Sequence, residues 1–223
     1  MLDMLFRVTT NLPIKIFVTS QPKPDIQLRV EAQLDERHSV CLLHDIKKSL
    51  VQADIKLYLL EQLANSAVPK SDLTQLASLS GSLFIYAATA VWYICRKGNI
   101  VDQAQLKVVL RPSSRLSYWH ADIDRLYSTI LDAAVYNPDQ EPEEQEQMLT
   151  LLWTAVCTQE SVSIDTLAAL AVIEVSKAMV LLQLLYSVLH VLHGTNMVSM
   201  LHALFPDFIF DKAWLARFCP RRL

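Results

Sequence analysis

Thr19–Gln21 is a polar segment whose side chains are placed where they could contact a ligand. It follows Ile14–Val18, a short run rich in β-branched and aromatic residues that predicts a buried strand of a parallel sheet. Pro22 and Pro24 come next and prevent further strand pairing. Because ligands of such sheets lie outside the carboxyl ends of the strands, the sequence makes Thr19–Gln21 a candidate binding site.

The sequence contains none of the common glycine-rich phosphate-binding loops. Its three glycines are Gly81, Gly98 and Gly194, and none of them is followed by lysine. Both a P-loop and a G-x-G-x-x-G motif are thereby excluded. His202 is a further candidate for a ligand contact, because an imidazole can donate to a phosphate in either protonation state. A purely structural role for His202 stays open.

The histidines, cysteines and carboxylates show no zinc spacing. Cys41, Cys95, Cys157 and Cys219 lie far apart without a C-x-x-C pair, so we expect reduced thiols that mostly serve packing in a cytoplasmic protein. The net charge of −3 gives no electrostatic reason to expect nucleic acid or an anionic membrane as a partner.

The segment Asn137–Glu146 marks the clearest boundary in the chain. It contains Pro138, Pro142 and a cluster of acidic residues. A proline near the first helical position and carboxylates near the positive end of a helix are typical of a helix start, which we predict here. An acidic metal site is the alternative.

The spacing of apolar residues predicts a chain that is mainly α-helical. Ser71, Ser82 and Ser163 are placed to cap three of the helices, and Gly81 is placed to end one. A short extended segment is expected at Ser39–Leu43. The expected helices are Met1–Thr10, Ala53–Leu63, Leu73–Leu79, Leu83–Cys95, Asp102–Leu110, Ile123–Ala134, Glu143–Cys157, Ile164–Leu170, Glu174–Leu185 and a final short helix with Phe205, Phe208 and Ile209.

A β-hairpin is expected after the helices Glu143–Cys157, Ile164–Leu170 and Glu174–Leu185. Its strands would be Ser187–His193 and Met197–Leu201, joined by Gly194–Asn196. Three helices followed by a hairpin are the outline of a winged helix, a fold that often binds DNA. However, Lys177 is the only Lys or Arg in residues 161–211, which leaves the presumed recognition helix without the cations that DNA binding requires.

Leu76–Cys95 carries no charged residue and is about as long as the roughly 20 residues that span a bilayer. Its first third is weakly apolar and interrupted by Gly81, so we predict a buried helix instead. Leu181–Leu192 is also uncharged but too short to span. Membrane association through Leu76–Cys95 remains an alternative.

Five segments together resemble the NACHT ATPases of fungi, which are STAND-class NTPases related to NLR and vegetative-incompatibility proteins. The resemblance covers nearly the whole chain, and it rests on the order and spacing of the segments. They are Leu12-Pro13-Ile14-Lys15-Ile16-Phe17-Val18-Thr19-Ser20-Gln21-Pro22, Leu43-His44-Asp45-Ile46, Gly81-Ser82-Leu83-Phe84-Ile85-Tyr86-Ala87, Leu126-Tyr127-Ser128-Thr129-Ile130-Leu131 and Leu201-His202-Ala203-Leu204-Phe205-Pro206-Asp207-Phe208.

The resemblance implies a nucleotide-sensing role for Thr19, Ser20 and Gln21. They match the sensor 1 position, where relatives usually have Thr-Ser-Arg and the arginine faces the γ-phosphate. Gln21 departs from this pattern, because a neutral amide lacks a charge-assisted contact that is typically worth about 1.5–3 kcal/mol. An exposed loop residue before Pro22 is the other interpretation of Gln21.

Two further sites are implied in the same way. Gly81 and Leu83 match a glycine–hydrophobic motif that packs near adenine in relatives, although the proline often found there is missing. A helix start that needs Gly81 as a cap is the alternative. His202 matches a histidine at the end of the winged helix that reaches the ADP β-phosphate, and it is followed here by Ala203 where relatives often have Asp.

On this resemblance the chain is mainly α, with four expected regions. Residues 1–36 would be the remnant of a parallel α/β nucleotide-binding core, and residues 37–112 a helical subdomain. Residues 113–141 would be a linking helix and acidic linker, and residues 142–223 a winged-helix-like module with a small β-hairpin. The P-loop and Walker B segments with which relatives bind ATP or ADP are not in these 223 residues.

The chain is therefore expected to be a fragment of a NACHT-type signalling NTPase that has no cofactor and no ATP hydrolysis by itself. Its expected partners are an upstream nucleotide-binding half or other protein domains. The family function is nucleotide-gated signalling in fungal self/non-self recognition. A non-catalytic helical protein-interaction module is the alternative.

Overall fold

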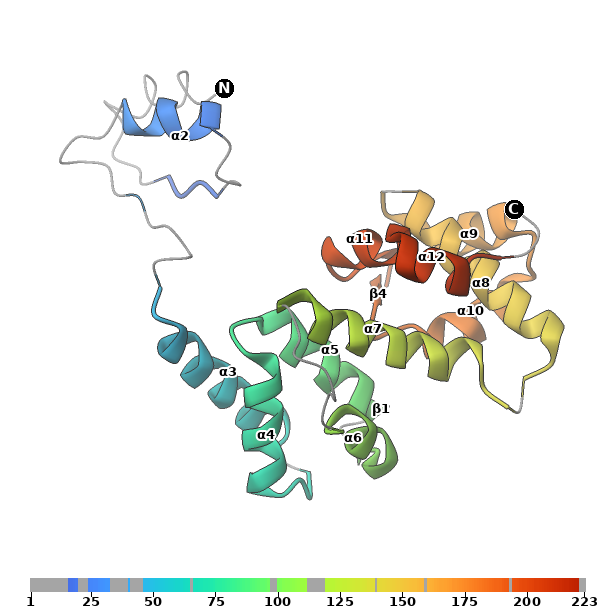
Figure 1. Ribbon diagram of the computed structural model, residues 1–223. Coiled ribbons are helices and arrows are strands. Elements are labelled where there is room, and N and C mark those ends of the chain that lie inside the picture. The colour runs from blue at the N-terminus through green and yellow to red at the C-terminus, as the bar shows by residue number, and fades with distance from the viewer. Residues whose placement is uncertain are drawn as a thin grey trace. The chain divides into compact units, whose positions relative to one another are not determined.

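In the computed structural model, the chain divides into two compact units, Met1–Lys47 and Lys48–Leu223. The described residues are mainly helical, with a small antiparallel sheet of three strands (Figure 1). The structure describes residues 16–19, 24–32, 40, 46–64, 66–96, 100–111, 119–138, 140–158, 160–192 and 194–220.

Helix α2 (Pro24–Glu31) is the helix described in the first unit. Pro24 stands at its first position, where a missing N–H leaves no hydrogen bond unmade, and Asp25 lies at the positive end. This helix is not among those predicted from the sequence, because its residues are polar and mixed in charge and show no apolar stripe.

The predicted buried strand at Ile14–Val18 is not confirmed by the residues described there. Ile16–Thr19 has no regular secondary structure, and the side chain of Phe17 is 90% exposed. A strand is stabilised by hydrogen bonds to a neighbouring strand and by burial of its side chains, and the described residues supply neither here. Met1–Thr10 and most of Ser39–Leu43 lie outside the described residues.

The second unit begins with four helices, of which α5 packs against the other three. Helix α5 contacts α3, α4, α6 and the later helix α7. It is apolar on nearly all sides, as expected for a helix buried among others. The four helices are α3 (Lys48–Gln62), α4 (Lys70–Ser80), α5 (Phe84–Ile94) and α6 (Gln103–Val109), with the two-residue strands β1 (Cys95–Arg96) and β2 (Ile100–Val101) paired antiparallel between the last two.

Helix α7 (Trp119–Val135) packs against both the helices before it and those after it. It contacts α5 and α6 and also α8 and α11. Ile123, Leu126, Tyr127 and Ile130 are all buried, and their spacing of three and four residues is the stripe that predicts this helix. The prediction of this helix is confirmed.

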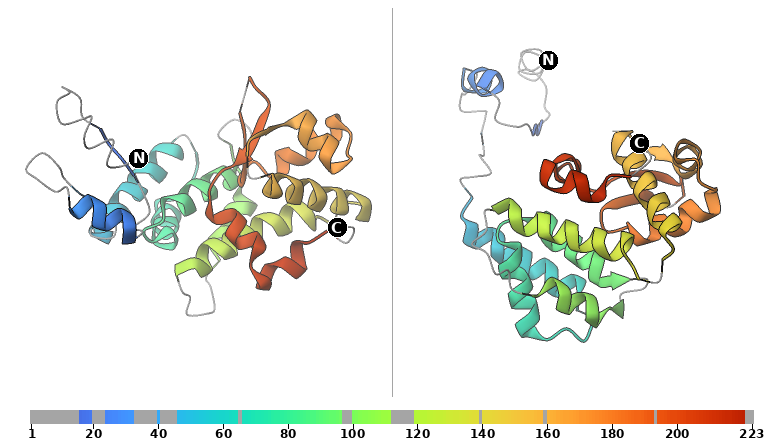
Figure 2. Two further views of the ribbon diagram at one scale, coloured as in Figure 1. Left: turned by 90° about the horizontal axis from the view of Figure 1, so that it is seen from above. Right: turned by 45° about the vertical axis from the view of Figure 1, so that its right-hand side comes forward.

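The remainder of the second unit combines helices with the three-stranded sheet. Strand β5 lies between β3 and β4 and is antiparallel to both, with Val198 opposite Val162 on one side and Val191 on the other. The β4–β5 hairpin extends away from the helices (Figure 2, left). The elements are α8 (Pro142–Cys157), β3 (Val162–Ser163), α9 (Ile164–Ala171), α10 (Val175–Leu184), β4 (Leu189–Leu192), β5 (Met197–Met200), α11 (Leu204–Phe210) and α12 (Lys212–Phe218).

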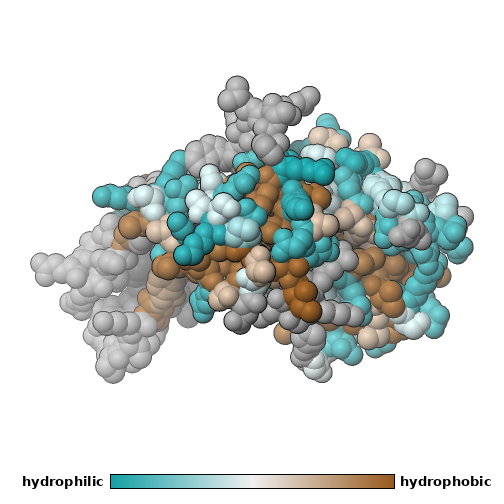
Figure 3. All heavy atoms as spheres, turned by 90° about the horizontal axis from the view of Figure 1, so that it is seen from below, coloured by the Kyte–Doolittle hydropathy of each residue, from teal (hydrophilic) through white to brown (hydrophobic). Residues whose placement is uncertain are grey.

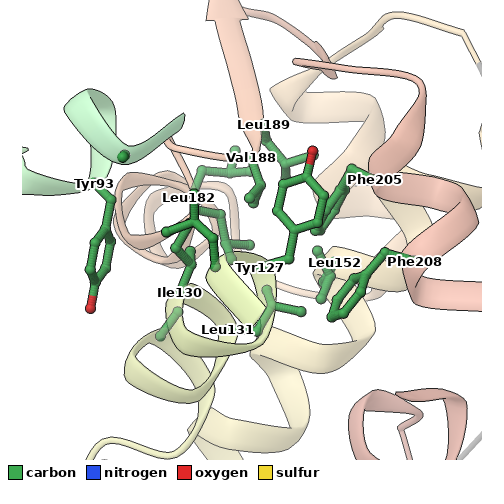
Figure 4. Packing of buried hydrophobic residues seen from close by; sticks show 14 of the residues in the cluster. Tyr93, Tyr127, Ile130, Leu131, Leu152, Leu182, Val188, Leu189, Phe205 and Phe208 are labelled. Atoms are coloured by element: carbon green, nitrogen blue, oxygen red, sulfur yellow. The ribbon is translucent and has the colours of Figure 1, made fainter. Parts of the chain in front are cut away.

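Aromatic side chains join α11 and α12 to the helices behind them. The ring centroid of Tyr127 lies 5.1 Å from that of Phe205 and 5.4 Å from that of Phe208 (Figure 4). The indole N–H of Trp153 on α8 donates to the carbonyl of Phe218. Because large aromatic residues bury much area, these contacts fix the short C-terminal helices, of which α12 is not predicted from the sequence.

Several predicted helix ends are confirmed and others are wrong. Ser71 lies inside α4 and Ser82 lies outside the N-cap position of α5, and neither helix has a side-chain cap. Ser163 caps α9 as predicted, and Pro142 is the first residue of α8. Leu170, the penultimate residue of α9, is 58% exposed.

Among the described residues, none of the helices is by itself both long and apolar enough to cross a membrane. One bent pair, α9 with α10, meets the length and composition criteria only when its two members are taken together. The uncharged stretch Leu76–Cys95 is divided between α4 and α5 by a turn that contains Gly81.

Candidate functional site

An open cleft of about 450 Å³ lies where the end of α8, strand β5 and helix α11 meet. It contains His202, so we call it the His202 cleft. Pairing of β3 with β5 forms it, because that pairing brings the α8–β3 connection beside the end of β5. The lining residues are Val156, Glu160, Ser161, Ser199, Met200, His202, Ala203, Pro206 and Phe210.

His202 lies in the cleft, between β5 and α11, and is half-buried. Its Nδ1 accepts a hydrogen bond of 3.1 Å from the N–H of Leu204, and its carbonyl accepts one of 3.2 Å from the N–H of Phe205. An accepting Nδ1 carries no proton, so the neutral ring is protonated at Nε2. Nδ1 therefore holds the start of α11, and the Nε2–H is the group left to contact a ligand.

The charge in the cleft does not favour a phosphate. Glu160 is exposed, and its carboxylate is a negative charge among the lining residues, which include no Lys or Arg. A bound phosphate is normally balanced by cations or by several N–H donors. With one imidazole N–H, two serine hydroxyls and a carboxylate, the cleft alone suits a neutral or basic polar group.

Gly81 and Leu83 lie in a tight turn between α4 and α5. The N–H of Leu83 donates to the carbonyl of Ser80 at 2.8 Å, and Gly81 has φ 56° and ψ −114°. These angles are those of the first central residue of a type II′ turn, a position that favours glycine. Leu83 packs against the hydrophobic core, and neither residue lines the His202 cleft. Both residues therefore have structural roles that require no adenine.

Of the three predicted sensor 1 residues, Thr19 is exposed, and Ser20 and Gln21 lie outside the described residues. They belong to the first unit, whereas the His202 cleft belongs to the second. Their nucleotide-sensing role stays a prediction.

The geometry around His202 does not form a nucleophilic centre. Ser161 and Ser199 line the same cleft, but the hydrogen bonds described for His202 are with backbone groups. An activated serine needs a direct hydrogen bond to its base, and none joins these side chains in the described part of the chain. Nor do the described residues contain a group of three or more His, Cys, Asp or Glu that could hold a metal ion.

The cysteines divide into two kinds. Cys95 and Cys219 are half-buried and pack against the core, as predicted, and burial raises the pKa of the Cys95 thiol. Cys157, at the end of α8, is exposed instead. All three are free thiols, and Cys41 lies outside the described residues.

If the chain bound DNA as a winged helix, α10 would be expected to carry cations, but its exposed side chains include apolar ones. On α10, Val175, Met179 and Val180 are exposed, and Lys177 forms an ion pair of 3.5 Å with Glu144. Hydrophobic side chains gather between hydrophilic ones on the face shown in Figure 3. An exposed apolar helix face is more typical of protein binding than of nucleic-acid binding.

Sequence reasoning finds His202 but misses the residues around it. Glu160 and Ser161 follow α8, and Ser199 and Met200 end β5, so they are far apart in the chain. No local pattern marks them, because the β3–β5 pairing alone brings them together.

Comparisons with protein-family models, with curated proteins and with solved structures find no match to this chain. The NACHT resemblance therefore remains a prediction from the sequence.

Proposed function

We propose that this chain is the regulatory part of a NACHT-type nucleotide-gated switch and has no ATP hydrolysis of its own. The observation that carries the proposal is the element order α8, β3, α9, α10, β4, β5, with β5 between β3 and β4. A helix, a strand, two helices and a hairpin whose second strand pairs with the first strand make up the winged-helix arrangement. The resemblance predicts that fold for residues 142–223.

The elements before it fit the same proposal. Helices α3 to α6 would be the helical subdomain, predicted for residues 37–112, and α7 the linking helix, predicted for residues 113–141. ATP or ADP would be held chiefly by an upstream nucleotide-binding half, and this chain would close over it as a lid. Such a lid acts as a switch only if it contacts one nucleotide state more strongly than the other.

His202 is the residue that would make this contact. Its Nε2–H can donate to a phosphate oxygen while its Nδ1 stays bonded to the Leu204 N–H. Because the described lining of the His202 cleft includes Glu160 but no Lys or Arg, His202 would supply one contact, and the upstream half would supply the remaining ones.

Calorimetric titration of the purified chain with ADP and with ATP tests the first part of the proposal. We expect binding no tighter than millimolar, since the described residues that line the cleft include no Lys or Arg. A micromolar dissociation constant would contradict the view that the nucleotide is held elsewhere.

Two substitutions in a form of the protein that contains a P-loop half test His202. His202→Ala removes both ring nitrogens, whereas in His202→Asn the amide oxygen can still accept from the Leu204 N–H and hold the start of α11. If Nε2 contacts ADP, both variants release ADP faster than the unsubstituted protein. If His202 is only structural, His202→Asn releases ADP at the original rate.

A second candidate function, a non-catalytic protein-interaction module, is favoured by the apolar surface of α10. Val180, 60% exposed, and Met179, 46% exposed, would contact a partner domain. If this is the function, Val180→Asp should weaken binding to the partner domain in a titration. Gln183, which is exposed on the same helix, provides the control substitution Gln183→Asp. His202→Ala would leave nucleotide release unchanged.

A further inference from the structure

Helix α3 has two apolar faces, one of which packs inside the second unit. Ile55 and Leu59 on α3 are buried, as is Leu63 directly after it, and α3 contacts α4 and α5. The opposite side of a surface helix is ordinarily polar. In α3 that side carries leucines instead.

These leucines form a regular stripe, which we call the α3 seam. It consists of Leu50, Ala53, Leu57 and Leu60, all of them exposed. Their spacing of three, four and three residues is that of the a and d positions of a heptad, the pattern of a helix that pairs with another helix. The side chain of Leu57 is 63% exposed and that of Leu50 is 57% exposed, so the described residues leave the seam largely uncovered.

The charges beside the seam indicate what covers it. With Leu50 and Leu57 at a, Lys56 is at g on one edge, and Asp54 and Glu61 are at e on the other. In a parallel pair of identical helices, the g residue of one copy faces the e residue five positions further along the other. Lys56 of each copy would then face Glu61 of the other copy. In an antiparallel pair the acidic edges would face each other, which is unfavourable.

We propose that a second copy of this chain binds the α3 seam, so that two α3 helices pair in parallel and in register. Helix α3 is already formed by packing against α4 and α5, so pairing bears no cost of helix nucleation. The buried face and the α3 seam lie on opposite sides of α3. In the paired arrangement, the helices α4 and α5 of each copy would therefore not block the interface. Because the seam is short, its area is below the roughly 1,200–2,000 Å² of a standard interface, and we expect a dissociation constant of about micromolar size.

Sedimentation equilibrium of the full chain from about 1 to 200 µM tests the proposal. We expect a monomer–dimer equilibrium that Leu57→Asp shifts to monomer throughout this range. Leu170→Asp on α9 is the matched control, since Leu170 is 58% exposed against 63% for Leu57 but lies outside the seam, and it should dimerise like the unsubstituted chain. Because Leu57 is exposed, Leu57→Asp should melt as the unsubstituted monomer does.

Charge reversal tests the direction of the pair. Lys56→Glu and Glu61→Lys each replace attraction by repulsion on both edges of the dimer, so each should raise the dissociation constant about tenfold. The double variant restores opposite charges and should return to within about threefold of the original value. A chain that stays monomeric, a Leu57→Asp variant that still dimerises, or a double variant as weak as the single ones would overturn the proposal. None of these outcomes depends on the nucleotide-switch function.

Discussion

Val172 has a left-handed backbone conformation that is unfavourable for its side chain, and replacing it should make the protein more stable. It ends α9 with φ 55° and ψ 45°. The N–H of Ile173 donates to the carbonyl of Ala168, and that of Val172 to the carbonyl of Ala169, which is the Schellman pattern of a helix end. Glycine or asparagine is usual at this position, whereas a β-branched residue is an outlier.

The expected gain follows from exposure and backbone energy. A left-handed conformation costs an ordinary L-residue roughly 1–2 kcal/mol, and asparagine adopts it more easily. The Val172 side chain is 90% exposed, so its removal sacrifices almost no buried area. Val172→Asn should therefore raise the free energy of unfolding by about 1 kcal/mol, or the melting temperature by about 2–4 °C. Val172→Gly should gain less, because glycine is more flexible in the unfolded chain.

Urea unfolding followed by circular dichroism measures these differences. Val172→Ala is one control, since it removes the side chain but keeps an L-residue in the left-handed conformation, and we expect little gain from it. Asn196→Val is the second control, because Asn196 has φ 52° and the substitution should lower stability by about 1 kcal/mol. If Val172→Asn and Val172→Gly are both no more stable than the unsubstituted chain, the strain argument fails.

Two further substitutions test local features of the fold. In urea titration, Gly81→Ala should lower the free energy of unfolding by about 1–3 kcal/mol, because the turn conformation of Gly81 is unfavourable for an L-residue. A steric clash would not be the cause, because no heavy atom lies within 4 Å of a Cβ added at Gly81. An unchanged free energy of unfolding would argue against the turn. Tyr127→Phe should be as stable as the unsubstituted protein at pH 7 or slightly more so, because the Tyr127 hydroxyl is buried without a hydrogen-bond partner among the described residues. Burial, with a smaller contribution from Asp124, raises the pKa of Tyr127 to about 12 from 10.0, so between these pH values the folded state keeps a proton that the unfolded state loses. The unsubstituted protein should therefore lose about 1.4 kcal/mol per pH unit relative to Tyr127→Phe in that window, and a constant difference between the two would contradict this assignment.

Features that depend on neighbours along the chain were largely predicted from the sequence. The apolar stripe of α7, the capping serine Ser163 and the proline that begins α8 act within one or two helical turns. The β4–β5 hairpin is likewise local, and its loop contains Gly194 and Asn196, both with positive φ. Helix α12 was missed because its seven residues are stabilised mainly by distant contacts, such as the ring contact of Tyr136 with Phe218 and the hydrogen bond from the Trp153 indole N–H to the Phe218 carbonyl.

The candidate site was predicted in part. His202 was identified, but the bond from the Leu204 N–H to its Nδ1, which leaves Nε2 as the donor, comes from the structure. Gly81 and Leu83 were assigned to an adenine site by resemblance, whereas their geometry is that of a turn and a core contact. The difference arises because a backbone turn can require the same short motif as a bound ligand.

By itself, the sequence determined that the chain is mainly helical, where most helices lie, and that no P-loop is present among its residues. Apolar periodicity, helix caps and turn residues depend on interactions between residues that are close in the chain, so they can be recognised without a structure. The tertiary structure decided the rest. Pairing of β3 with β5 created the His202 cleft from distant segments, and burial of Ile55 and Leu59 left the α3 seam exposed. The sequence shows apolar residues on both sides of α3, but which side faces the core depends on the shapes of α4 and α5, which no local pattern encodes.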